Sequence, residues 1–100
     1  GGVSPCYALS HHYSYFAVDG RKKRVSRYVL ANVNEQPLSE IWMSEEYVRF
    51  RSEVRGFHFP SCPDCDLREG CDLRESNEGC WGWNPSCADC LWAQDIVRCP

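Results

Sequence analysis

The chain has 100 residues, eight of them cysteine, and a formal net charge of −3. This length suits one small domain, or a domain from a larger enzyme. No stretch approaches the roughly 18 consecutive apolar residues that a membrane span needs. The acidic balance disfavours a general nucleic-acid binder, because such proteins neutralise phosphates with a basic surface. We therefore expect no membrane and no nucleic acid among its partners.

The first half of the sequence predicts a β-hairpin over residues 13–33. Residues 13–18 mix aromatic and β-branched side chains, which is typical of a strand. Asp19-Gly20 follows as a tight-turn signal, and the return strand is expected from about Lys23 to Val33. The basic run 21–24, with Arg27, is interpreted as a solvated turn and strand face. Two strands alone are marginally stable, so this hairpin is expected to pack against a helix or the metal-binding lobe.

A helix is predicted over residues 44–55. Its apolar stripe has helical spacing and consists of Met43, Tyr47, Phe50 and Val54. Ser44 is the expected N-cap, and Gly56 is expected to take the left-handed conformation that ends the helix. Residues 37–42 predict a short helical turn just before it. That turn is expected to present three side chains to the same core, namely Leu38, Ile41 and Trp42.

The cysteines carry the strongest chemical signal. They are Cys6, Cys62, Cys65, Cys71, Cys80, Cys87, Cys90 and Cys99. Seven of the eight lie in the last 39 residues, and four of those seven form two C-x-x-C units, 62–65 and 87–90. This spacing aims two sulfurs at one metal ion or cluster, whereas a disulfide across so short a loop would be strained. We therefore expect metal ligands, and with them a reducing compartment, the cytoplasm.

The composition of the second half indicates that metal contributes to folding. Residues 61–90 hold six cysteines but few aliphatic side chains. Such a segment buries too little apolar surface to offset the loss of chain entropy. Structural metal in zinc-finger peptides supplies about 10–16 kcal/mol, which is also folding energy. The predicted fold class is therefore a small α+β domain over residues 1–100, stabilised by metal, with an irregular cysteine-rich lobe at 61–100.

A short internal repeat lies among the cysteines. Residues 65–69, Cys-Asp-Leu-Arg-Glu, recur at 71–75. This pattern predicts two similar turns, each beginning with a ligand, with solvated Asp, Arg and Glu side chains. A second interpretation lets Arg68 or Arg74 offset the negative charge of a thiolate-ligated cluster.

The spacing of several of these residues resembles the SPASM domain, a C-terminal extension of radical S-adenosylmethionine (SAM) enzymes. The resemblance covers nearly the whole chain and rests on Leu38-x2-Ile41-Trp42, Arg51 and Cys62-x2-Cys65-x5-Cys71. Cys6 and Asp19-Gly20 are similar to the opening of the family pattern, although Val25 stands where the family has its next cysteine. The segment from Cys80 to Cys99 is most similar to the branch that matures tungsten-cofactor oxidoreductases.

The resemblance implies one or two auxiliary [4Fe–4S] clusters that support substrate binding and electron transfer. It also implies a radical SAM catalytic barrel as partner in the parent chain, SAM bound there, and a peptide or protein substrate. The C-x3-C-x2-C run of the radical-generating cluster is missing from this sequence, so no complete active site and no catalytic residue are expected. The parent would be an oxidoreductase or maturase.

The resemblance also suggests how the cysteines divide between sites. One site takes Cys62, Cys65 and Cys71, closed by Cys90 or Cys99, and the other takes Cys6, Cys80 and Cys87. The spacing leaves an alternative open, a zinc-binding interaction module that recognises a protein or a nucleic acid through the 21–27 face. Its four-thiolate site would use Cys62, Cys65, Cys87 and Cys90. Zinc is also possible in the isolated domain, because zinc and iron both accept four thiolates.

Overall fold

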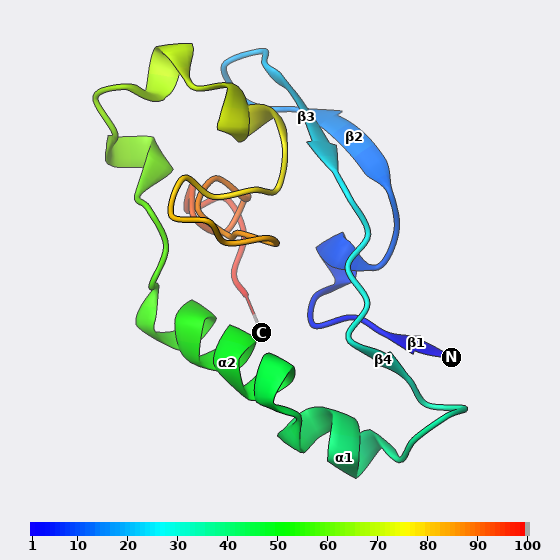
Figure 1. Cartoon of the computed structure of the whole chain (residues 1–100). Coiled ribbons are helices and arrows are strands. Elements are labelled where there is room, and N and C mark those ends of the chain that lie inside the picture. Colours follow the sequence, from blue (N-terminus) through cyan, green and yellow to red (C-terminus); the bar gives the residue numbers. More distant parts are fainter. Residues whose placement is uncertain (100) are drawn as a thin grey trace. The chain divides into compact units, whose positions relative to one another are not determined.

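The computed structural model describes residues 1–99. Its helices and strands are, in chain order, β1 (Gly2–Val3), β2 (Tyr13–Phe16), β3 (Lys22–Val25), β4 (Ala31–Asn32), α1 (Leu38–Met43) and α2 (Glu45–Gly56) (Figure 1). Two compact units can be distinguished. The first contains Gly1–Tyr13 and Val25–His58, and the second contains Ser14–Arg24 and the described chain from Phe59 onward. Within residues 1–99, no helix has the length and apolar character needed to cross a membrane.

In the first unit, two short strands and two helices surround a small apolar core. β1 pairs antiparallel with β4, with Gly2 opposite Asn32 and Val3 opposite Ala31. α1 packs against α2. The buried apolar side chains of this unit are Leu9, Val25, Ile41 and Phe50. This is the small α+β class that the sequence predicts.

Helix α2 confirms the predicted helix and its N-cap. The backbone N–H of Tyr47 donates to Ser44 Oγ over 3.3 Å, and Glu45 and Glu46 place negative charge near the positive end of the helix dipole. The predicted C-terminal stop is wrong by one residue. Gly56 stays helical and Phe57 takes the left-handed conformation with φ 47°.

Helix α1 also forms, but only part of its expected core face is buried. Ile41 is fully buried, whereas Trp42 is 50% exposed and Leu38 is exposed as well. Arg51 accounts for the position of Trp42. Its guanidinium lies 3.9 Å from the centre of the Trp42 ring and donates through Nη1 to the Trp42 carbonyl over 2.6 Å. A cation over an aromatic face stabilises the indole at the surface. This contact explains why the Trp42 ring is half exposed and is not buried in the core.

The predicted hairpin is present but shorter than expected. β2 pairs with β3, and Gly20 takes φ 83° in the turn between them. The return strand ends at Val25 rather than Val33. Since β2 begins only at Tyr13, residues beyond Val25 have no further partner in the hairpin. Their backbone turns to the first unit instead, where Tyr28 N–H donates to the Leu9 carbonyl over 2.9 Å.

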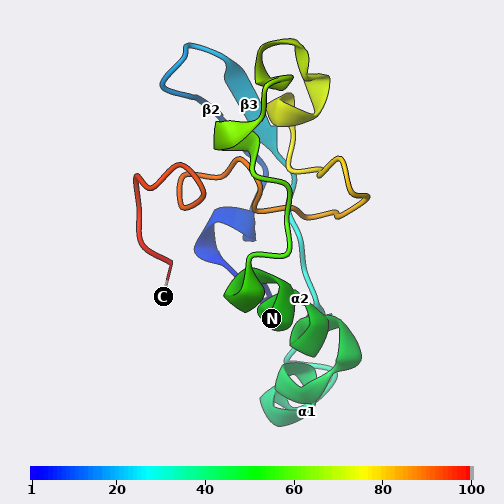
Figure 2. The same ribbon diagram turned by 90° about the vertical axis from the view of Figure 1, so that its left-hand side faces the viewer.

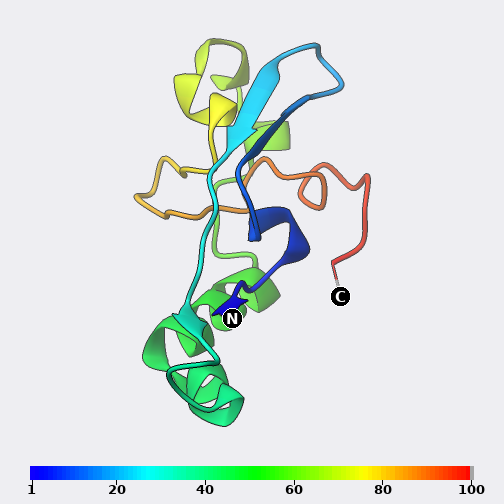
Figure 3. The ribbon, with the colours of Figure 1, turned by 90° about the vertical axis from the view of Figure 1, so that its right-hand side faces the viewer.

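The cysteine-rich part of the second unit is irregular, as predicted. It contains three short 3₁₀ turns, η2 (Cys62–Asp64), η3 (Arg68–Gly70) and η4 (Asp72–Glu75), shown in yellow-green in Figure 2. Among the described residues, no helix or strand follows Glu75, and Figure 3 shows the orange-to-red segment as an irregular chain. The buried apolar residues of this unit are Phe59, Ala88 and two prolines, Pro60 and Pro85. Within the described residues, its other buried side chains are all polar or charged, namely Lys23, Arg74, Asn77, Ser86 and Asp89.

Replacing Glu53 with glutamine should stabilise the chain at neutral pH. Glu53 is buried in α2, its Oε1 has no hydrogen-bond partner, and burial raises its pKa despite Arg49 nearby. The folded form therefore holds this proton more tightly than the unfolded chain. The protonated Glu53 side chain contributes its full share of stability at pH values below its pKa in the unfolded chain. This contribution is lost as the pH rises through its higher pKa in the folded protein. We expect Glu53→Gln to gain about 1 kcal/mol at pH 7 over the wild type, because an uncharged amide costs less to bury than a carboxylate.

Urea unfolding of both forms at pH 4 and pH 7 checks this prediction. The advantage of the glutamine variant should shrink at pH 4, where the carboxyl group of the wild type is mostly protonated in both states. An equal difference at the two pH values would contradict the assignment to Glu53.

Candidate metal centre

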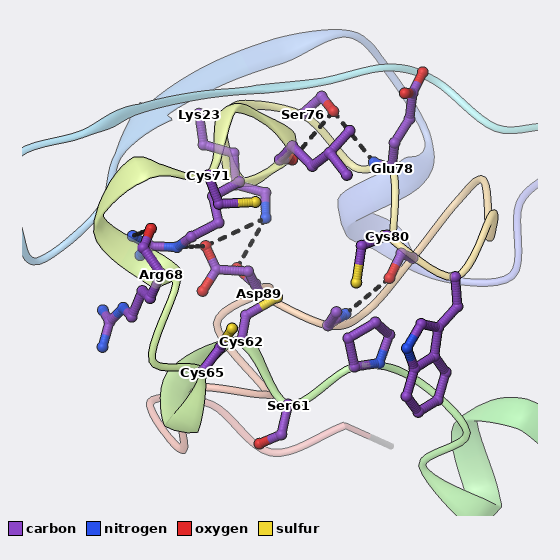
Figure 4. A pocket seen from close by; sticks show the side chains of 16 residues that line it. Lys23, Ser61, Cys62, Cys65, Arg68, Cys71, Ser76, Glu78, Cys80 and Asp89 are labelled. Carbon is purple, nitrogen blue, oxygen red and sulfur yellow. Dashed lines mark hydrogen bonds and ion pairs between the residues drawn. The ribbon is translucent and has the colours of Figure 1, made fainter.

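Four of the eight cysteines line one cavity in the second unit. They are Cys62, Cys65, Cys71 and Cys80, and the cavity volume is about 240 Å³. Figure 4 shows these side chains around the cavity, with Lys23 and Asp89 among them. Every residue that lines the cavity belongs to the second unit. The structure therefore gathers the Cys62-x2-Cys65-x5-Cys71 run with a fourth thiol from further along the chain.

Local turns place the first three of these thiols. In η2, the N–H of Cys65 donates to the Cys62 carbonyl over 3.2 Å, which closes a single turn around the C-x-x-C unit. The internal repeat makes two similar turns, as predicted. Arg68 N–H donates to the Cys65 carbonyl over 3.1 Å, and Arg74 N–H donates to the Cys71 carbonyl over 3.4 Å. Each half of the repeat thus begins with a cavity-lining cysteine.

A buried ionic network lies beside the thiols and centres on Asp89. Lys23 Nζ donates to the Asp89 backbone carbonyl over 2.9 Å and lies 3.9 Å from Asp89 Oδ2. Arg74 Nε donates to the same Oδ2 over 3.1 Å. Lys23 and Asp89 are each 4% exposed and Arg74 is 2% exposed. The prediction of a solvated repeat is therefore wrong for Arg74, because its charge is paired inside the unit.

The network continues to the hairpin turn at Asp19. Arg74 Nη2 donates to Asp19 Oδ2 over 3.0 Å, and Arg68 lies 3.8 Å from the same oxygen. The backbone N–H of Arg21 and the Arg74 guanidinium hold the pKa of Asp19 below its usual value. Arg21 itself donates to the backbone carbonyls of Cys71 and Glu69 over 2.6 and 2.7 Å.

These contacts correct the interpretation of the basic run as a solvated face. Lys22 and Arg24 are exposed, but Lys23 is buried and Arg21 is bound to the segment that carries Cys71. Alternation along β3 is the physical reason, because successive side chains of a strand point to opposite sides. Sequence reasoning missed Lys23, Asp89 and Asp19 at this site. The position of Asp89 inside the second C-x-x-C unit is the signal that could have drawn attention to it.

The thiols have different acidities. Burial raises the pKa of Cys62, and Asp89 raises it further while Lys23 acts in the opposite direction. A hydrogen bond with Cys87 lowers the pKa of Cys90 to about 6, against the effect of burial. Burial lowers the pKa of Lys23, whereas Asp89 and the Cys90 and Cys62 thiolates raise it. The Lys23 ammonium thus lies within electrostatic reach of thiols from both C-x-x-C units.

The remaining cysteines do not line this cavity. Cys6 belongs to the first unit. Cys87 and Cys90 belong to the second unit and contact each other, and Cys99 is exposed. Within residues 1–99, no three His, Cys, Asp or Glu side chains are close enough together to hold a single metal ion, and this includes the four cysteines predicted for zinc.

The donor set fits an iron–sulfur cluster. A [4Fe–4S] cluster is held by four cysteine thiolates, and each binds a different iron. Its ligands therefore surround a cavity, while the ligands of one zinc ion converge on one point. The four thiols here lie around a cavity.

Comparison with known proteins gives the same class. The model of the SPASM family, an iron–sulfur cluster-binding domain, matches residues 1–66. The chain therefore belongs to the SPASM family of iron–sulfur cluster-binding domains, as its sequence pattern indicates. It is also 46% identical over 101 residues to the tungsten-containing aldehyde ferredoxin oxidoreductase cofactor-modifying protein of Pyrococcus furiosus. That match covers the whole of this chain and 28% of the length of the relative. No solved structure matches the chain.

Proposed function

We propose that the chain is an auxiliary-cluster domain that holds one [4Fe–4S] cluster in the cavity of the second unit. The proposed ligands are the four thiols that line it, Cys62, Cys65, Cys71 and Cys80. Their arrangement around one cavity is the observation that carries the proposal. It replaces Cys90 or Cys99 with Cys80 as the fourth ligand of this site.

The cluster, when bound, would accept and donate single electrons. The chain's own residues hold the thiols in place. η2 and the repeated turns fix Cys62, Cys65 and Cys71, while Trp81 and Pro60 contribute apolar surface to the cavity wall. A less polar surrounding is one of the factors that set the potential of a cluster.

The parent protein would be a radical SAM enzyme that modifies a cofactor, a peptide or a protein. The relative from Pyrococcus furiosus is named as a cofactor-modifying protein and is much longer than this chain. We infer that SAM and the radical-generating cluster bind in a catalytic barrel outside these residues, because this sequence has no C-x3-C-x2-C run. The expected location is the cytoplasm, since eight cysteines without the spacing of a disulfide framework suit a reducing compartment.

Iron and sulfide analysis of the chain, purified without oxygen and reconstituted with iron and sulfide, tests this function. We expect about four irons per chain and a brown charge-transfer absorption that dithionite bleaches. About eight irons would show a second site, formed by cysteines that do not line this cavity. Tight zinc with no stable iron uptake would favour the zinc-binding module instead. Arg21 and Lys23 have internal partners, which leaves that module a smaller 21–27 face than expected.

A further inference from the structure

We propose that Lys23 and Asp89 set the reduction potential of the cluster in this cavity, Lys23 by raising it and Asp89 by lowering it. The inference rests on the proposed function, because it assigns a role to residues that surround the four thiols. Neither residue belongs to the proposed ligand set. Both would act on the cluster through the electrostatic effect of their charge, without binding it.

The first argument is burial. Lys23 and Asp89 both line the cavity and are each 4% exposed. Charges interact more strongly away from water, because the effective dielectric constant falls. Taking an ammonium or a carboxylate out of water is also costly unless a partner compensates it. Buried charges that line the same cavity as the four thiols therefore have a large effect on a charge held by those thiols.

The second argument is the uneven sharing of one carboxylate between two cations. Arg74 has the closer contacts, 3.1 Å to Asp89 Oδ2 and 3.0 Å to Asp19 Oδ2. Lys23 Nζ lies 3.9 Å from Asp89 Oδ2, and its short hydrogen bond of 2.9 Å goes to the uncharged backbone carbonyl. The charge of Arg74 is thus paired with two carboxylates. The positive charge of Lys23 is less completely neutralised, so it has an electrostatic effect on a cluster bound in the cavity.

The third argument is the direction of the effect. Reduction of a thiolate-ligated cluster adds one negative charge to a group that is already anionic. A fixed cation stabilises the reduced form more than the oxidised form and raises the potential, while a fixed carboxylate does the reverse. The two residues are held in place by β3 and by the second C-x-x-C unit. They need no rearrangement when the electron arrives.

Redox titration of the reconstituted chain, followed by electron paramagnetic resonance, tests this inference. The variants are Lys23→Met and Asp89→Asn, with Lys22→Met as the matched control. Lys22 is the neighbouring residue of the same strand, carries the same charge and is exposed. Iron content is measured first, so that each titration reports on a chain with a complete cluster.

We expect opposite shifts from the two buried positions. At a fixed potential, Lys23→Met should lower the ratio of reduced to oxidised cluster about tenfold, which corresponds to 59 mV for one electron. Asp89→Asn should raise that ratio, and Lys22→Met should change it less than twofold. Loss of structure alone would not shift the two variants in opposite directions.

The outcomes separate this inference from the proposed function. A wild-type chain that takes up no iron overturns the proposed function and this inference with it. Wild-type iron content in both variants with unchanged potentials, or with shifts of the same sign, overturns the inference alone. If Lys23→Met loses its iron, Asp89→Asn carries the test, and an unchanged or lower potential then overturns the proposal.

Discussion

Replacing Cys80 with serine should reduce the iron bound in the cavity from about four atoms per chain to less than one, since a cluster with a lost ligand is not held. Cys80 lies nine residues after Cys71, outside the C-x2-C-x5-C run, and it lines the same cavity as that run. A serine hydroxyl is a harder and less acidic donor than a thiol and does not replace a thiolate on iron. The measurement is iron per chain after anaerobic reconstitution and desalting.

Cys99→Ser is the control for this prediction. Cys99 does not line the cavity, so this variant should keep the iron count and the visible spectrum of the wild type. The reverse result, in which Cys99→Ser loses iron and Cys80→Ser keeps it, would show that Cys99 is the fourth ligand. Iron lost with neither variant would point to Cys90 as the fourth ligand.

Removing the cluster should unfold the second unit. Among the described residues, just over half of its buried residues are polar or charged, and the buried apolar ones are Phe59, Ala88 and two prolines. A unit with so little buried apolar surface cannot offset its chain entropy. Structural zinc supplies about 10–16 kcal/mol to zinc-finger peptides, and we expect a cluster to have an effect of the same order here. The buried Lys23, Arg74 and Asp89 would then lose the packing that keeps their charges paired.

Hydrogen exchange before and after treatment with ferricyanide and a chelator measures this effect. The amides of the 62–75 turns should lose nearly all protection, including the Cys65 N–H that donates to the Cys62 carbonyl. The α2 amides, for example Val48 donating to the Ser44 carbonyl, serve as the internal control. They should keep more of their protection, because α2 carries its own cap and the buried Phe50. Unchanged protection of the 62–75 turns would contradict the prediction.

Local signals in the sequence predicted the two helices and the hairpin turn correctly. Helix α2 could be identified because its apolar spacing, its Ser44 cap and its acidic first turn all act within a few residues. The hairpin turn followed in the same way from Asp19-Gly20. The length of the return strand could not be predicted, since it depends on where another segment of the chain ends. The exposure of Trp42 likewise depends on Arg51, nine residues away.

By itself, the sequence determined the chemistry of this protein. Eight cysteines with two C-x-x-C units, in a segment poor in aliphatic residues, indicated an iron–sulfur cluster-binding domain, and the family match confirms that class. Only the tertiary structure decided which thiols share a cavity and which charges lie beside them. Lys23 and Asp89 are 66 residues apart, and their contact depends on how the hairpin and the irregular lobe fold together. Spacing fixes the geometry of a single turn, whereas long-range pairing follows from packing of the whole unit.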